Sequence, residues 1–234
     1  MNTQMQAKIQ KMFDSIAKHY DLLNTLLSLG LHKKWKKRIA SYFTNSNSYK
    51  ILDIATGSGD IAIILKKKLG DKADITGLDF SSEMIKIAHT KAQKLNLNIN
   101  FIEADAKSLP FPDKQFDYVT IAFGIRNIPE ILPCLNEISR VLKHNGGLII
   151  LEFGMPSKPF LLVYKLYNKI IIPLLGFLIT RNFNAYKYLA DTSINYPSGN
   201  DFLKILHNTG IFKSLNYKPL AFGVAYLYFA ELNS

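Results

Sequence analysis

The chain has 234 residues, of which 48% are apolar and 20% are charged. This length and composition predict one folded α/β domain with a sizeable core. Its single cysteine, Cys134, excludes an intrachain disulfide framework and suits a reducing compartment, which we expect to be the cytoplasm. We interpret Cys134 as a small core residue.

The chain carries 29 Lys and Arg against 18 Asp and Glu, a formal net charge of +11. Such an excess attracts nucleic acid or an anionic membrane surface. The densest basic cluster is "HKKWKKR" at residues 32–38. It is either a solvated helix face or a membrane-attracted one. Because no zinc-finger, RNP-type or basic-tail pattern is present, we expect no nucleic-acid partner.

The first residues contain no apolar core of a signal peptide, so we expect none. The most apolar segment is residues 160–179, but two lysines and an asparagine interrupt it. Pro173 and Gly176 are expected to break its longest apolar run. A bilayer span needs about 20 mostly apolar residues with few charges, so we reject a transmembrane helix. An apolar surface helix and a lid over an apolar pocket both stay open.

The predicted elements begin with helices over the first forty residues, where apolar residues recur in helical steps and Gly30 is expected to stop a helix. An alternation of short apolar strands and helices follows. The expected strands are 49–55, 73–80, 99–105, 116–123 and 147–153, and the expected helices are 60–70, 81–96 and 132–146. This alternation predicts a parallel sheet with helices on both faces.

The last part of the chain breaks the alternation. A helix at 201–212 leads to strands at 213–220 and 222–232, which lie close in sequence and are expected to pair antiparallel. Residues 155–199 form an aromatic and aliphatic insertion that we expect to be helical and to cover a substrate. With residues 1–44 as an N-terminal helical cap, residues 1–234 are expected to form a single domain.

The stretch "ILDIATGSGD" at residues 51–60 carries the clearest chemical signal. Gly57, Gly59 and Ala62 match G-x-G-x-x-A between a strand and a helix, and Asp79 ends the next strand. This is a nucleotide-binding arrangement, in which glycines allow a tight turn and close approach of a ligand, and the acid accepts ribose hydroxyls.

Two nucleotide classes compete for this turn. A dinucleotide would place a pyrophosphate beside Asp53 and Asp60, which repel it. S-adenosylmethionine carries a sulfonium and an ammonium, which carboxylates attract. We therefore expect Asp53 to face its methionine half, Asp79 its ribose, and Asp105 with Ala106 its adenine. The alternatives are that Asp53 and Asp105 only cap turns, and that the chain is a nicotinamide-dependent oxidoreductase.

Several stretches of the sequence resemble those of a known family. "ILDIATGSGD", "GLDFS" and "EADAKSLPFPDKQFDYVTIAFGIRNI" are similar to class I S-adenosylmethionine-dependent methyltransferases. "MFDSIAKHYDLLNTLLSLGLHKKWKKR", "FGIRN" and "YKYLADTSINYP" extend the resemblance to the demethylmenaquinone/ubiquinone-biosynthesis C-methyltransferases over nearly the whole chain. It implies a Rossmann-like, mostly parallel seven-stranded sheet with an antiparallel last strand. It also implies donor contacts at Ser58, Asp79, Asp105 and Ala106.

The expected chemistry is in-line methyl transfer to a ring carbon of a reduced quinone, which becomes nucleophilic as a neighbouring hydroxyl loses its proton. The catalyst must bring the atoms together and stabilise the oxyanion. Arg126 and Asn127 follow a strand at the ligand-binding edge, so we assign them catalytic and substrate-binding roles. Tyr20 is expected to close the site. The alternatives are a structural ion pair for Arg126 and simple packing for Tyr20.

The expected substrate is a small lipid quinol, and the expected reaction is C-methylation of demethylmenaquinol in menaquinone biosynthesis. We favour this quinol because no transit peptide is evident and the chain resembles shorter bacterial members. A ubiquinone precursor, 2-polyprenyl-6-methoxy-1,4-benzoquinol, and an RNA methyltransferase are the alternatives. The five histidines show no metal-ligand spacing, so we expect no metal. Peripheral contact with the inner face of the membrane and a homodimer stay open.

Overall fold

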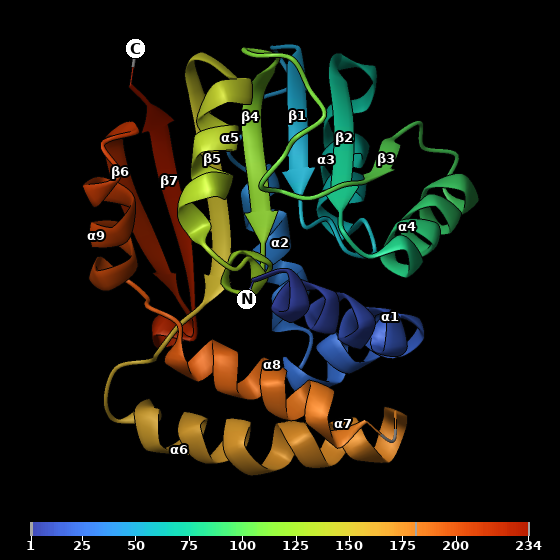
Figure 1. Cartoon of the computed structure of the whole chain (residues 1–234), viewed down its shortest axis with the longest axis vertical. Helices are drawn as coiled ribbons and strands as arrows, with labels where there is room; N and C mark the ends of the chain where they lie inside the picture. The colour runs from blue at the N-terminus through green and yellow to red at the C-terminus, as the bar shows by residue number, and fades with distance from the viewer. Residues whose placement is uncertain (1, 181, 234) are drawn as a thin grey trace.

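Short strands rich in apolar and β-branched residues form the centre of the molecule. The computed structural model describes residues 2–180 and 182–233, and its seven strands make one sheet in the order β3-β2-β1-β4-β5-β7-β6 (Figure 1). The pairs β1–β2, β1–β4, β2–β3 and β4–β5 are parallel, and β7 is antiparallel to both β5 and β6. The predicted mostly parallel sheet with an antiparallel last strand is therefore confirmed.

The bounds of the elements follow the predicted alternation closely. The strands are β1 Tyr49–Ile54, β2 Ala73–Asp79, β3 Asn100–Glu103, β4 Phe116–Ala122, β5 Leu142–Phe153, β6 Phe212–Leu220 and β7 Ala225–Leu232. The α-helices are α1 Asn2–Leu27, α2 Leu31–Ala40, α3 Asp60–Leu69, α4 Ser82–Lys94, α5 Ile131–Val141, α6 Phe160–Leu166, α7 Ile172–Thr180, α8 Phe183–Asn195 and α9 Asn200–Asn208.

Two apolar layers cover the sheet. One contains buried side chains of α2, α3 and α4, among them Trp35, Leu65 and Ala88. The other contains those of α5 and α9, including Leu135 and Phe202. Buried helix positions recur at helical spacing, so each helix turns one apolar stripe to the sheet. Ser81 caps α4, since its side chain accepts a hydrogen bond from the backbone N–H of Met84 at 3.2 Å.

A third apolar cluster joins α1, α4 and α8, and it includes Phe13, Ile16, Met84 and Tyr186. Figure 1 shows α1 and α8 beneath the carboxyl ends of β1 and β4, with α6 and α7 as the layer farthest from the sheet. Helices from both ends of the chain therefore close the edge at which parallel sheets bind ligands.

One predicted boundary was wrong. The helix expected at 132–146 ends at Val141, and β5 already begins at Leu142. Asn145 takes a left-handed φ of 59°, and the register of β4 against β5 shifts between Phe116 and Tyr118. Extra residues of β5 therefore lie opposite β4 at this point, where the sequence reads Asn145-Gly146-Gly147.

The apolar segment at 160–179 is helical through Pro173 and Gly176, although these two residues interrupt its longest apolar run in the sequence. A π-helical turn at Tyr167–Ile171 joins α6 to α7, so Pro173 enters where the hydrogen-bond ladder is already displaced. Within the described ranges, Phe160–Ile179 is one helix long and apolar enough to cross a membrane by length and composition, and most of it is exposed.

Gly176 sets the packing of α7 on α8. A Cβ at this position would lie 2.1 Å from Cγ of the fully buried Tyr186. We expect Gly176→Ala to destabilise this helical pair by about 1–3 kcal/mol through overpacking. Faster amide exchange confined to 155–199 is the measurement. Leu174→Ala, an exposed position on the same helix, serves as control, and equal exchange in the two variants would contradict the assignment.

Candidate active site

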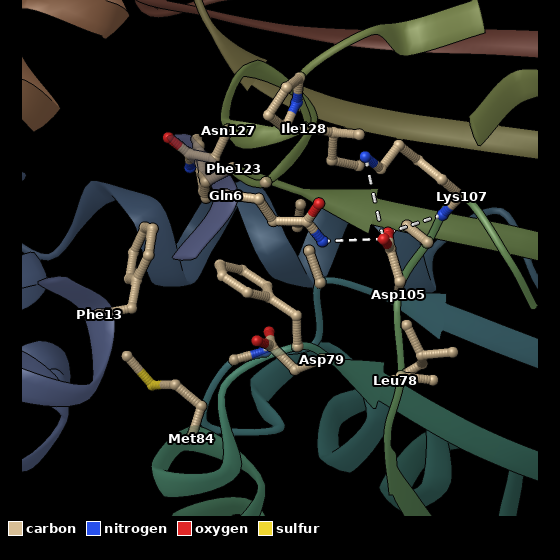
Figure 2. Close-up of a pocket in the computed structure, with 18 of the residues that line it drawn as sticks. Gln6, Phe13, Leu78, Asp79, Met84, Asp105, Lys107, Phe123, Asn127 and Ile128 are labelled. Carbon is tan, nitrogen blue, oxygen red and sulfur yellow. Dashed lines mark hydrogen bonds and ion pairs between the residues drawn. The ribbon is translucent and has the colours of Figure 1, made fainter. Parts of the chain in front are cut away.

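A cavity of about 60 Å³ lies at the carboxyl edge of the sheet, between the strand ends and α1. In Figure 2, Gln6 and Phe13 point into it from α1, and Asp79 and Asp105 border it from the ends of β2 and β3. Its wall is completed by residues of the turns after β1, β2, β3 and β4. These are Ala55, Gly57, Phe80, Ala104, Ala106, Lys107, Phe123, Gly124, Asn127, Ile128 and Pro129.

Asp79 is the buried carboxylate of this cavity. One oxygen accepts the backbone N–H of Gly57 at 2.8 Å, and the other accepts that of Ser81 at 3.0 Å. Burial raises the pKa of Asp79 to about 6, although these backbone hydrogen bonds oppose the rise. Each oxygen keeps a lone pair for a further donor, so Asp79 can accept hydroxyl groups as expected for a ribose-binding acid.

The two glycines of the turn do different things. Both take left-handed φ values, 55° at Gly57 and 81° at Gly59. A Cβ on Gly57 would meet only a ring carbon of Tyr20 at 4.0 Å, whereas one on Gly59 would lie 2.9 Å from Ala88 and 3.0 Å from Phe101. Gly57 therefore leaves space toward the cavity, and Gly59 allows the helix behind it to pack.

Asp53 differs from expectation. Its carboxylate is 1% exposed and accepts the hydroxyls of Thr56 and Thr120 at 2.6 and 2.7 Å. Burial raises its pKa to about 6. Asp53 therefore supports the turn from beneath and does not face the cavity, because the strand turns its side chain to the threonines. This is the turn-supporting role that the sequence left as the alternative.

Ser58 and Asp60 belong to an ionic cluster on the outer side of the turn. Lys91 of α4 contacts Asp21 of α1 at 2.8 Å, the Ser58 hydroxyl at 3.2 Å and Asp60. Lys36 of α2 contacts the second oxygen of Asp60 at 2.8 Å. Although burial acts against ionisation, the two ammonium groups hold the pKa of Asp60 well below its usual range.

This cluster corrects the electrostatic argument from sequence. That argument relied on the charges of Asp53 and Asp60 beside the bound nucleotide. The fold brings Lys36 and Lys91 to Asp60 from distant positions, and Asp53 points away. The carboxylates that do border the cavity are Asp79 and Asp105.

Asp105 lies at the other end of the cavity. Its carboxylate accepts the Lys107 backbone N–H at 2.9 Å and the Gln6 side-chain amide at 2.8 Å (Figure 2). The –NH₂ group of Gln6 donates to Asp105 in the way that the exocyclic amine of an adenine could. Ala106 lines the same end of the cavity, so the two residues expected to bind an adenine lie together.

These residues fit the expected donor, with one requirement. The Asn127 side-chain oxygen is buried and accepts no hydrogen bond within residues 2–180 and 182–233, so it is available to an ammonium group. Ligand pockets typically measure about 300–1,000 Å³, far more than this cavity. Room for a nucleoside therefore requires that Gln6 and Phe13, the α1 side chains that point into the cavity, move aside.

A second, larger cavity of about 470 Å³ lies on the other side of Tyr20 and Phe123, which line both cavities. Its wall comes from α1, α2, α6, α8 and the turn before β7, and it is mainly apolar. Trp35, Phe123 and Phe153 form an aromatic group in this wall, with Phe123 and Phe153 only 4.3 Å apart between ring centroids.

Arg126 lines the second cavity and Asn127 the first, so the predicted catalytic pair is divided between them. Arg126 donates to Glu152 at 2.5 Å and to the Phe123 carbonyl at 2.8 Å. The Arg126 side chain is only 5% exposed and that of Glu152 only 1%. Burial raises the pKa of Glu152 against the opposing charge of Arg126. Among the described residues, Nε of Arg126 has no acceptor.

Several residues of the site could not be identified from the sequence. Glu152 lies in a mainly apolar strand, and neither it nor Gln6 or Lys91 belongs to a motif that marks a site in the sequence. Only the regular apolar face of α1 hinted that this helix packs over the site. In the parts of the chain that the structure describes, no group of three or more His, Cys, Asp or Glu is placed to hold a metal.

Comparisons with known proteins agree with this geometry. The model of the ubiE/COQ5 methyltransferase family matches residues 1–231. A Rickettsia conorii protein named ubiquinone/menaquinone biosynthesis C-methyltransferase UbiE is 43% identical, over 98% of this chain and 94% of its own. A Thermus thermophilus demethylmenaquinone methyltransferase is 42% identical, over 94% and 99%. A Methanococcus maripaludis structure, described as a putative S-adenosyl-L-methionine-dependent methyltransferase, shares the fold with a TM-score of 0.67 at 21% identity, over 95% of this chain and 94% of that one.

The two glycines give a matched pair of variants. We expect Gly57→Ala to fold with a modest loss of about 1 kcal/mol and to bind S-adenosylhomocysteine at least about tenfold more weakly, since its methyl group enters the ligand space. Gly59→Ala should lower the melting temperature more, because it also meets Ala88 and Phe101. Calorimetric titration and thermal denaturation separate these effects. A Gly57→Ala protein with unchanged affinity would remove that glycine from the site.

Binding of S-adenosylhomocysteine should weaken as Asp79 takes up a proton. With a pKa of about 6, affinity at about pH 5.5 should be roughly fourfold below its value at neutral pH. Titration calorimetry across this range measures the change.

Unfolding cannot mimic the effect, because a carboxyl whose folded pKa lies above its unfolded value adds stability as pH falls through that range. Asp79→Asn should bind more weakly at every pH and show a flatter profile. An unaltered profile in this variant would assign the pH dependence to another group.

Proposed function

Because the chain belongs to the ubiE/COQ5 methyltransferase family, we propose that it methylates a ring carbon of a reduced polyprenyl naphthoquinone, converting demethylmenaquinol to menaquinol. The chain is an S-adenosylmethionine-dependent methyltransferase, as its family and fold together indicate. The finer assignment concerns the acceptor that this chain uses.

The observation that carries the proposal is the meeting of two unlike cavities. One is bordered by carboxylates and a glycine turn, and the other is apolar and large enough for a bicyclic ring with part of a chain. Tyr20 and Phe123 stand at their boundary. Group transfer between two bound molecules needs this arrangement, because the reacting atoms must come within about 3–3.5 Å while water is kept out.

When bound, S-adenosylmethionine supplies a methyl group on a positively charged sulfur. Asp79 would hold its ribose hydroxyls, Asp105 and Ala106 its adenine, and the free oxygen of Asn127 its ammonium. Phe123 and Tyr20 supply apolar surface between the two cavities, which excludes water from the point of transfer.

Arg126 is suited to hold the acceptor. Its unpaired Nε–H can donate to a quinol oxygen as negative charge develops there, while the Nη1 bonds to Glu152 and Phe123 keep the guanidinium in place. Because Nε is buried, the acceptor has to displace the side chains that cover it before this donor can act. The structural ion pair weighed as an alternative for Arg126 and the catalytic role are therefore compatible.

The aromatic wall supports a naphthoquinol as acceptor. Trp35, Phe123 and Phe153 offer flat aromatic surface on which a fused bicyclic ring can lie. The Thermus thermophilus relative is named for demethylmenaquinone. The second candidate is the methoxy-benzoquinol precursor of ubiquinone, because the name of the Rickettsia conorii relative gives ubiquinone beside menaquinone.

Testing Arg126 requires removing its partner as well. Loss of Arg126 alone leaves Glu152 charged and buried, which costs about 3–5 kcal/mol, so Arg126→Ala confounds folding with catalysis. We expect Arg126→Met/Glu152→Met to fold and to lose turnover of reduced demethylmenaquinone by about 10²–10³-fold. A labelled methyl donor measures turnover.

The matched control is Asp201→Asn/Lys204→Met, which removes an exposed ion pair on α9 and should leave turnover unchanged. Turnover by the folded Arg126→Met/Glu152→Met protein at the unaltered rate would exclude Arg126 from the chemistry. Faster methylation of the methoxy-benzoquinol than of the naphthoquinol by the unaltered enzyme would select the second candidate.

A further inference from the structure

The helix formed by α6, the π-turn and α7 exposes its large apolar side chains and buries smaller or polar ones, the reverse of the usual arrangement in water. Its outward face carries large apolar side chains, whereas the buried positions Asn168, Pro173 and Gly176 are polar or not bulky. Exposed members are Phe160, Leu162, Val163, Leu166, Ile170, Ile171, Leu174, Phe177 and Leu178, with Leu162 at 77%. Contiguous exposed apolar surface of this extent marks an interaction site.

The same face surrounds the mouth of the apolar cavity. Leu29, Val163 and Phe222 line that cavity and are also 84%, 69% and 71% exposed, so they stand at its opening. Phe160 stacks on Phe222 with ring centroids 4.8 Å apart. Three separate segments thus contribute apolar side chains to one rim, and the cavity opens on the face that α6 and α7 form.

The charge around this face has one sign. None of the 18 acidic residues falls in 22–52 or in 154–190, the two segments that supply most of the rim and the helix. Their basic residues include Lys33 and Lys34, exposed just after the Leu29 tip, and Lys165 and Lys169, exposed on the helix itself. An apolar face with cationic residues and no acids matches an anionic lipid surface.

The helix is placed to lie along a membrane, not to cross it. Its inner side packs on α1 and α8, and Tyr167 donates to the Leu27 carbonyl at 3.0 Å. Both neighbours in the chain, β5 and α8, belong to the same folded body (Figure 1). A spanning helix would have to put these two neighbours on opposite sides of the bilayer.

From these observations we propose that residues 160–179, with the Leu29 tip and Phe222, seat the enzyme in the interfacial layer of an anionic bilayer. The mouth of the apolar cavity then faces the lipid, and a polyprenyl tail stays in the bilayer while its head group enters. This last step rests on the proposed function, whereas the docking surface stands on its own geometry.

Co-sedimentation of the full chain with vesicles, in the absence of any quinone, tests the surface. The vesicles are phosphatidylcholine alone or an equimolar mixture with phosphatidylglycerol. We expect the unaltered protein to prefer the anionic vesicles and to keep part of its binding at high salt. Leu166→Glu/Leu174→Glu, both on the exposed face, should weaken that binding about tenfold or more.

Gln93→Glu/Leu95→Glu adds the same two charges at the exposed end of α4, toward the opposite edge of the sheet, and should bind nearly as the unaltered protein does. Equal binding by the two double variants would overturn the proposal, as would absence of binding. The proposal would also be overturned if the unaltered protein were a dimer that Leu166→Glu/Leu174→Glu dissociates without any change in vesicle binding. The apolar face would then be the contact between two copies of the chain.

A short-chain quinol in solution separates this proposal from the proposed function. Leu166→Glu/Leu174→Glu should methylate it at the unaltered rate and fail only on long-chain quinol in vesicles. An unaltered enzyme that binds vesicles but does not methylate the short quinol would refute the proposed function and leave the docking surface standing. Equal turnover of vesicle-bound quinol by variant and unaltered enzyme would refute a role for docking in catalysis.

Discussion

The ammonium group of Lys91 joins helix α1 to the glycine turn beneath it. It contacts Asp21 on α1, Ser58 in the glycine turn and Asp60 at the start of α3, and Lys36 ties α2 to the same carboxylate. Four segments distant in sequence therefore meet at one half-buried cluster. Together with the hydrogen bond from the Ser58 hydroxyl to Asp21, this cluster anchors the part of α1 that carries Tyr20, which stands between the cavities.

The two cavities divide the chemistry by polarity. Carboxylates and a backbone turn suit a polar, cationic cosubstrate, whereas aromatic rings suit a lipid head group. The Arg126–Glu152 pair stands behind the apolar cavity and is balanced in charge, so it places a donor there without leaving a net buried charge. Buried ion pairs seldom add stability, and their retention is better explained by placing a group accurately.

Much of this arrangement could be read from local patterns. Strand and helix alternation, the turn with Gly57 and Gly59, and Asp79 at a strand end all depend on neighbours within a few residues. The seven-stranded sheet with its antiparallel last strand followed from the family resemblance. Asp53 could not be placed, because the orientation of a side chain at a strand end depends on Thr120 from another strand. Lys91 and Glu152 have partners 70 and 26 residues away, at Asp21 and Arg126. Pairing at such separations leaves no periodic trace in a single sequence.

The proposed function requires that the apolar cavity hold the acceptor while the cavity beside it holds the donor. Trp35 is the only tryptophan in the chain, and it is buried in the acceptor cavity wall. Its fluorescence can be followed while a short-chain naphthoquinone is added to the protein. We expect saturable quenching that persists when S-adenosylhomocysteine is bound. Absence of quenching, or its displacement by S-adenosylhomocysteine, would contradict the account.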